Sequence, residues 1–121
     1  MSQQPRLARF DEDGWELESA EARVVESGEK FWIAPLNERM SLGPEDQAKL
    51  LFRIRTEPGL YDADEHVERM WVTVINREDN FYVGALDNQP KQPGRTYLGM
   101  PVRFLPEHVV EVGRADHSPE Q

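Results

Sequence analysis

Residues 67–90, "VERMWVTVINREDNFYVGALDNQP", contain two runs of strand-forming residues and decide the fold class. In the first run Met70, Val72 and Val74 share one face of an extended chain, because side chains of a strand alternate between its two faces. The joint "REDN" at 77–80 predicts a four-residue hairpin loop before the second run, 81–86. Gly84 lies inside that run, which is typical of a bulge or a close backbone approach. We therefore expect an antiparallel hairpin here.

The flanking stretches predict three more short strands. In "QAKLLFRIR", 47–55, the period is two, and the apolar face consists of Ala48, Leu50, Phe52 and Ile54. After the hairpin, "PVRFLPEHVVEV" at 101–112 predicts a strand at 102–104, a 3₁₀ turn at 106–108 and a last strand at 109–112. Pro101 has no N–H to donate, so we expect it at a strand start or edge.

Ahead of these strands the pattern is helical. Ser19 is a suitable cap for a two-turn helix from Ala20 to Glu26, and Pro35 is suited to open a shorter helix that ends at Met40. Residues 43–46, Gly-Pro-Glu-Asp, predict a turn. We expect flexible tails at 1–12 and 113–121 and one globular domain at 13–112, with a helical lead-in (13–46) followed by the strands (47–112).

Five short strands, with a long loop after the first and a 3₁₀ turn before the fifth, predict an α+β fold that is mainly β: a small SH3-like barrel behind a short helical segment. The stretch "RFLPEHVVEV" resembles the end of SH3 domains. Val109 stands where those domains place a ligand-binding Tyr, and this departure weighs against their groove for proline-rich ligands.

The same hairpin, followed by "LGMPVRFLPEHVVEV", also resembles the YegJ-like family of bacterial domains of unknown function. The resemblance covers roughly residues 15–112, and its most specific parts are "ERMWV" (68–72) and "LDNQP" (86–90). The chain departs from the family at 44–46, where Pro-Glu-Asp replaces the usual Pro-Gly-Asp. The resemblance implies a single bacterial domain and brings no reaction or ligand.

Charge sets limits on the partner. The chain has 14 Lys and Arg against 23 Asp and Glu, a formal net charge of −9, and no visible basic cluster, so we expect no nucleic acid to bind. A protein partner is expected, with a basic surface as one option, and the chain itself as a monomer or weak homodimer. The residues Asp62, Asp64, Glu65 and Glu68 are expected to form an acidic loop. Without Cys, an apolar leader or a membrane span, the default localisation is cytoplasmic.

No catalytic signature occurs in the chain, and its few histidines are His66, His108 and His117. The acidic loop together with His66 offers oxygen and imidazole ligands for a cation, but acids in a loop are usually solvated and no known spacing occurs. We expect no catalytic residues, no metal and no cofactor.

The ending Asp87-Asn88-Gln89-Pro90 has two interpretations. Asp and Asn at a strand end commonly bond their own backbone, and Pro90 holds Gln89 extended, so a structural turn is the first. In the second, Asp87, Asn88 and Pro90 form a binding rim with Trp71 or Tyr82 as its aromatic floor, as at protein interfaces. Trp71 is itself more typical of a core residue.

These patterns favour a non-enzymatic protein-binding module. One alternative is an immunity or antidote-type inhibitor that engages a basic toxin or a nucleic-acid-binding protein through negative charge. A weaker alternative is a hydrolytic enzyme that uses Asp87, or Asp64 with His66.

Overall fold

The structure, a computed structural model, describes residues 6–28, 31–56, 65–91 and 94–115. Its elements, in chain order, are α1 (Phe10–Asp13), β1 (Trp15–Leu17), α2 (Ala20–Ser27), α3 (Leu36–Arg39), β2 (Gln47–Arg55), β3 (Glu65–Glu78), β4 (Phe81–Leu86), β5 (Pro101–Phe104), the 3₁₀ helix η2 (Pro106–His108) and β6 (Val109–Gly113). The prediction of a mainly β chain with short N-terminal helices is confirmed.

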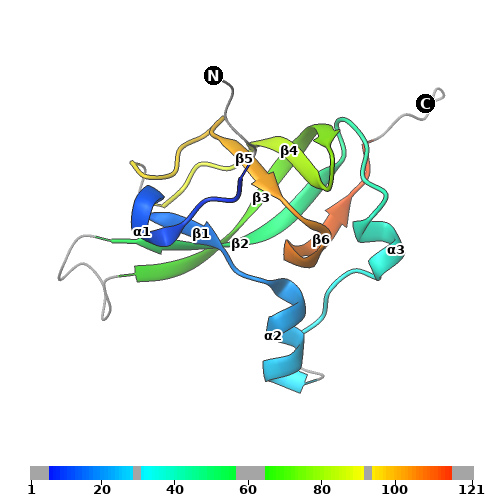
Figure 1. Cartoon of the computed structure of the whole chain (residues 1–121), viewed down its shortest axis with the longest axis horizontal. Helices are drawn as coiled ribbons and strands as arrows, with labels where there is room; N and C mark the ends of the chain where they lie inside the picture. The colour runs from blue at the N-terminus through cyan, green and yellow to red at the C-terminus, as the bar shows by residue number, and fades with distance from the viewer. Residues whose placement is uncertain (1–5, 29–30, 57–64, 92–93, 116–121) are drawn as a thin grey trace.

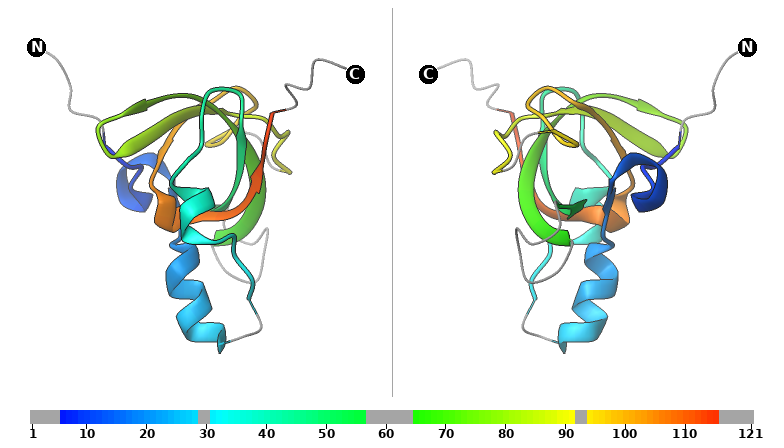
Figure 2. Two further views of the ribbon diagram at one scale, coloured as in Figure 1. Left: turned by 90° about the vertical axis from the view of Figure 1, so that its right-hand side faces the viewer. Right: turned by 90° about the vertical axis from the view of Figure 1, so that its left-hand side faces the viewer.

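The strands form one antiparallel sheet that curls into a half-barrel (Figures 1 and 2). The path runs β1-β2-β3-β4-β5, and β6 pairs with β2 outside this path. Strand β2 is long enough to hold two partners on one side: β6 lies along Gln47–Leu50 and β1 along Phe52–Ile54. The five predicted strands are therefore present as β2 to β6, and β1 is an addition that the sequence did not predict.

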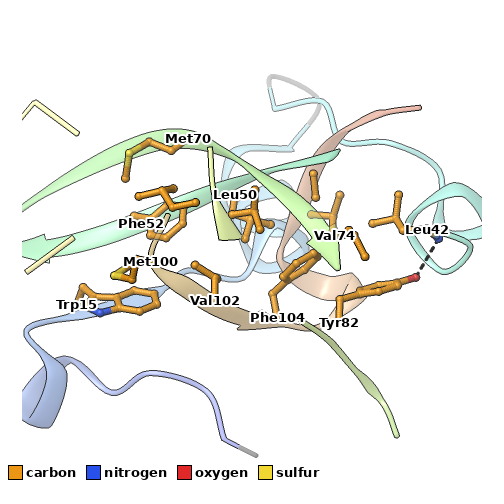
Figure 3. Close-up of a cluster of buried hydrophobic side chains, with 14 of the residues drawn as sticks. Trp15, Leu42, Leu50, Phe52, Met70, Val74, Tyr82, Met100, Val102 and Phe104 are labelled. Atoms are coloured by element: carbon orange, nitrogen blue, oxygen red, sulfur yellow. Dashed lines mark hydrogen bonds between the residues drawn. The ribbon is translucent and has the colours of Figure 1, made fainter. Parts of the chain in front are cut away.

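The core fills the inside of the curl (Figure 3). The predicted apolar face of β2 is confirmed, since Ala48, Leu50, Phe52 and Ile54 are all buried. They pack with residues from every other strand and from two loops, namely Trp15, Leu42, Met70, Val72, Val74, Tyr82, Leu86, Met100, Val102, Phe104 and Val109. A smaller cluster on the outer face of β2, with Leu51, Ala20 and Val110, attaches the base of α2, which projects away from the sheet (Figure 2).

The central hairpin is tighter than predicted. Strand β3 continues to Glu78 and β4 begins at Phe81, so the turn is Asp79-Asn80 and the expected four-residue loop is wrong. Asp79 adopts φ 54°, a left-handed conformation that Asp tolerates better than most residues and that lets the ladder close early. The expectation for Gly84 is confirmed: a Cβ there would lie 2.5 Å from the Thr73 carbonyl oxygen, beside a bulge in β3.

The N-terminal prediction holds for α2, because the Ser19 hydroxyl accepts the Ala22 N–H at 3.1 Å as a cap. Pro35 precedes α3 as its cap residue and does not lie within it. A helical turn, α1, occurs at the boundary where a flexible tail was expected to end. It forms because the Asp13 carboxylate accepts the Arg9 N–H at 2.8 Å and so caps the turn.

At the other end Pro101 starts β5, η2 follows as predicted, and β6 ends at Gly113. The next two residues are also held, where a flexible tail was expected. The Asp46 carboxylate accepts the Ala115 N–H at 2.9 Å and a guanidinium N–H of Arg114 at 3.0 Å.

Candidate functional site

The predicted turn at 87–90 continues the sheet after β4 ends. The side-chain oxygen of Asn88 accepts the backbone N–H of Trp71, and the Asp87 N–H donates to the Trp71 carbonyl at 2.8 Å. The Asn88 side chain therefore replaces a backbone carbonyl in the ladder. Pro90 is buried directly after it. These contacts agree with the structural interpretation of the turn.

The Asp87 carboxylate is exposed but has protein partners. One of its oxygens accepts from the Gln47 amide at 2.6 Å and from the Thr73 hydroxyl at 3.1 Å, and the Gln47 amide also donates to Thr73 at 3.1 Å. This three-residue network links β2, β3 and the end of β4 on the outer face of the sheet.

Of the two aromatic residues considered as a floor beside this turn, Tyr82 lies in the core, whereas Trp71 lies on the same outer face as Asp87. Tyr82 is completely buried, donates its hydroxyl to the Arg39 carbonyl at 2.8 Å and accepts the Leu42 N–H at 3.3 Å. It points inward because β4 buries its even-numbered residues. Trp71 is half-buried on the outer face and belongs to neither apolar cluster, so its expected place in the core is wrong. The Lys49 ammonium lies 5.0 Å from the centroid of its ring.

Of the acidic loop, Asp62 and Asp64 lie outside the described residues. Glu65 is the first residue of β3 and makes two hydrogen bonds, at 2.7 and 2.9 Å, with Arg53, which lowers the pKa of that carboxyl. Glu68 accepts the Lys91 N–H at 3.1 Å and lies 3.4 Å from His66. Both described acids therefore lie in strand β3, not in a loop as expected, and both have partners within the domain.

Of the residues in the hydrolytic alternative, Asp64 lies outside the described part of the chain. The backbone N–H of Asp87 donates to the carbonyl of Trp71. His66 lies five residues before Trp71 on β3, so these two residues are roughly 16 Å apart at the rise of a strand. Within the described ranges no three His, Asp or Glu side chains are grouped in a way that could hold a metal ion.

A different site lies at the seam of the half-barrel, between the two ends of its sheet. A pocket of about 420 Å³ is lined by Arg6, Ala8, Asp13, Trp15, Arg95, Tyr97, Met100, Pro101 and Arg103. Trp15 belongs to β1, the first strand of the path, and Pro101 and Arg103 belong to β5, the last. Trp15 and Met100 are also core residues, so the pocket floor is fixed by the main packing (Figure 3).

This arginine pocket is positive in a chain that is strongly negative overall. Its three arginines and one aspartate carry +3 and −1, which leaves +2. Arg6 is already paired with Asp13, at 3.1 Å, and with Glu12, at 3.5 Å. Arg95 and Arg103 have no ion pair with any acid of the described chain, and the Arg103 Nε is buried there without a hydrogen-bond acceptor. Two guanidinium groups of the lining are thus without an acidic partner in the described chain.

The absence of a side chain at Gly14 leaves room for the side chain of Arg95. The Arg95 side chain lies across Gly14, where a Cβ would come within 2.5 Å of one terminal guanidinium nitrogen and closer still to Cδ. The neighbouring Tyr97 and Leu98 expose 50% and 56% of their surface. Pocket, Tyr97 and Leu98 therefore form one surface with charged and apolar parts.

This pocket is not evident from the sequence alone. Arg6 is far along the chain from Arg95 and Arg103, and only the closing of the sheet brings them to one place. The available signal was "GRTYLGMPVR" (94–103), which has two arginines around Tyr-Leu and contains no acid.

None of the helices in the described part of the chain has the length and apolar content that crossing a membrane requires. Comparison with known proteins adds no relative: no family model, no curated protein and no solved structure matches this chain. The resemblance to the YegJ-like family accordingly stays a prediction.

Proposed function

We propose that this protein is a non-enzymatic protein-binding module that takes an acidic segment of its partner in the arginine pocket. The observation that carries the proposal is the placement of Arg95 and Arg103, without acidic partners in the described chain, beside the exposed Tyr97 and Leu98. Tyr and Arg are the residue types enriched where protein interfaces gain most of their free energy. An acidic group next to an apolar side chain is the complementary ligand.

The fold that presents this surface is, in our proposal, an SH3-like barrel. Its support is the return of β6, after the single turn η2, to pair with β2. Ligand sites at the mouth or seam of a β-barrel are common, because the scaffold is rigid and the rim residues are free to vary.

The proposal of binding without catalysis rests on the lining residues. Asp13 is the acid among them, and the Arg9 N–H and the Arg6 guanidinium lower its pKa, so it stays ionised and is a poor proton donor. The lining contains no His, Ser or Cys to act as base or nucleophile. Its cations fit recognition and electrostatic attraction.

The test uses two fluorescent peptides of equal length and equal Leu and Phe content, one rich in Glu and the other in Lys. The acidic peptide should bind more tightly to the full chain, and this binding should weaken with salt. Arg95→Gln and Arg103→Gln should each weaken it by about tenfold, or about 1.4 kcal/mol, the size of a charge-assisted contact at a partly exposed site.

Arg69→Gln is the matched control. Arg69 is an exposed arginine of β3 that lies over the Phe31 ring, 5.2 Å from its centroid, and it does not line the pocket. Equal losses in all three variants would mean that only net charge matters, and the pocket would then have no part in binding.

The second candidate is the antidote-type inhibitor, for which the net charge of −9 is the specific support. It predicts that the Lys-rich peptide binds more tightly than the Glu-rich peptide, since a basic partner would bind the acidic surface. Tight binding of the Lys-rich peptide that Arg95→Gln and Arg103→Gln leave intact would favour this candidate.

A further inference from the structure

The charge of the arginine pocket points to a particular anion. We propose that the group it receives is a phosphate monoester dianion, an inference that rests on the proposed binding function and names its ligand. Arg6 is paired with Asp13 and Glu12, whereas Arg95 and Arg103 bring two positive charges that have no acidic partner in the described chain. A phosphate monoester carries about −1.5 to −2 at neutral pH and would neutralise both, whereas a carboxylate would neutralise one.

The hydrogen-bond donors agree with this match. A phosphate offers three acceptor oxygens, and arginine forks bind such oxygens in pairs. Arg6 donates to Asp13 and to the Leu7 carbonyl, so its capacity is largely used. The guanidinium groups of Arg95 and Arg103 donate no hydrogen bond to another residue of the described chain, and the buried Arg103 Nε has no acceptor there. Two arginines are thus available to hold one phosphate.

The remaining lining suits the group that carries the phosphate. Tyr97 forms a half-exposed aromatic wall at the rim, and Trp15 and Met100 close the floor. An ester with a planar or apolar body would place the phosphate among the arginines and its body against Tyr97. The volume, about 420 Å³, lies within the range of ligand pockets.

The titratable and charged lining groups are Arg6, Asp13, Arg95, Tyr97 and Arg103, which come from the N-terminal segment, α1, the 94–100 loop and β5. None of them is a histidine. The second ionisation of a phosphate monoester, with a pKa near 6, is therefore the protonation expected to govern binding between about pH 5 and pH 7.5.

The experiment compares phenyl phosphate with phenyl sulfate, which has nearly the same shape but a single charge, by calorimetry on the full chain. At about pH 7.5 we expect the phosphate to bind at least about tenfold more tightly, since one further charge-assisted contact is worth about that factor. At about pH 5 only about a tenth of the phosphate is a dianion, so the difference should nearly vanish. Circular dichroism at both pH values verifies that the protein stays folded.

Arg95→Gln and Arg103→Gln should each remove the preference for phosphate, and Arg69→Gln should keep it. Because Arg95 is exposed, its variant tests the pocket even where Arg103→Gln fails to fold. Equal affinity for the two esters, or a preference unchanged in both pocket variants, would overturn the phosphate assignment. If the Glu-rich peptide still needs Arg95 and Arg103 in that case, only this inference fails; if it does not, the proposed function fails as well.

Two further ligands identify the source of the phosphate. A peptide with one phosphorylated tyrosine represents a modified partner protein, and a nucleoside 5′-monophosphate represents a small metabolite. Tighter binding of the peptide assigns a phosphorylated side chain, and tighter binding of the nucleotide assigns a small ester. Binding of neither would contradict phosphate recognition.

Discussion

The side chain of Arg95 lies across the α-carbon of Gly14, in space that a Cβ would occupy. Gly14 ends α1 with φ 80°, in the left-handed region, and donates its N–H to the Phe10 carbonyl at 3.0 Å. One glycine thus stops the helical turn and leaves room for an arginine of the pocket. The conformation of α1 and the position of Arg95 are therefore coupled.

Gly14→Ala should reduce binding of the acidic peptide while costing little more stability than the backbone strain requires. The left-handed conformation costs an alanine about 1–2 kcal/mol, and the exposed Arg95 moves aside easily. Gly28→Ala is the control, because Gly28 also has positive φ, 64°, but a methyl group added there would meet no atom within 4 Å. Chemical denaturation and peptide titration of both variants should show a stability loss in each and a binding loss only in Gly14→Ala.

Tyr82→Phe should destabilise the protein by about 1–3 kcal/mol, since the Leu42 N–H and the Arg39 carbonyl would lose their buried partner. Urea unfolding followed by tryptophan fluorescence measures the change. Tyr97→Phe, which removes a hydroxyl at the exposed rim, should change stability by less than about 0.5 kcal/mol. Comparable losses in the two variants would argue against the structural role of Tyr82.

Asn88→Ala should cost about 0.5–2 kcal/mol, because the Trp71 N–H loses the oxygen that extends the ladder. Gln89→Ala, at the next and exposed position, should be nearly neutral. Hydrogen exchange gives a local measurement: the Trp71 amide should lose protection in the Asn88 variant alone. Unchanged exchange at Trp71 would show that the turn does not depend on this contact.

Some of these features could be predicted from the sequence and others could not. Alternation of apolar residues located β2 to β6 and the buried face of β2, because burial on one side of a sheet imposes a period of two. It could not say which face of β4 is inward: Tyr82 and Phe81 are both aromatic, and the register with β3, set by the two-residue turn and the bulge, decides. Alternation alone therefore leaves Tyr82 as plausible on the surface as in the core.

The pocket was beyond such reasoning for a different reason. A net charge of −9 describes the whole chain, whereas a ligand responds to the few charges within its reach. Local acids such as Glu65 and Asp46 are neutralised by Arg53 and Arg114. At the seam of the sheet, Arg95 and Arg103 have no such partner in the described chain. Ion pairs between residues that are distant in the sequence set the sign of the local charge, and the sequence alone does not show these pairs.

The stability of the protein should fall as the pH drops from about 6.5 to about 4, through His108. Burial lowers the pKa of His108 to about 4, against a small opposite effect of Glu21, and its Nδ1 accepts the Leu105 N–H at 2.9 Å. In this range the unfolded chain binds a proton at His108 that the folded protein refuses, so the free energy of unfolding decreases towards acid, by up to roughly 3 kcal/mol. His108→Asn, which retains a side-chain acceptor but does not titrate, should flatten this slope. His66→Asn is the control, and thermal unfolding of the three proteins across the range measures the effect. Below about pH 4 the free energy of unfolding should fall further in all three proteins, because Asp46 is held ionised in the folded state. Burial raises the pKa of Asp46, but the N–H groups of Ala115 and Gly43 and the Arg114 guanidinium lower it overall. A His108→Asn protein that keeps the full slope above pH 4 would show that another group takes up the proton.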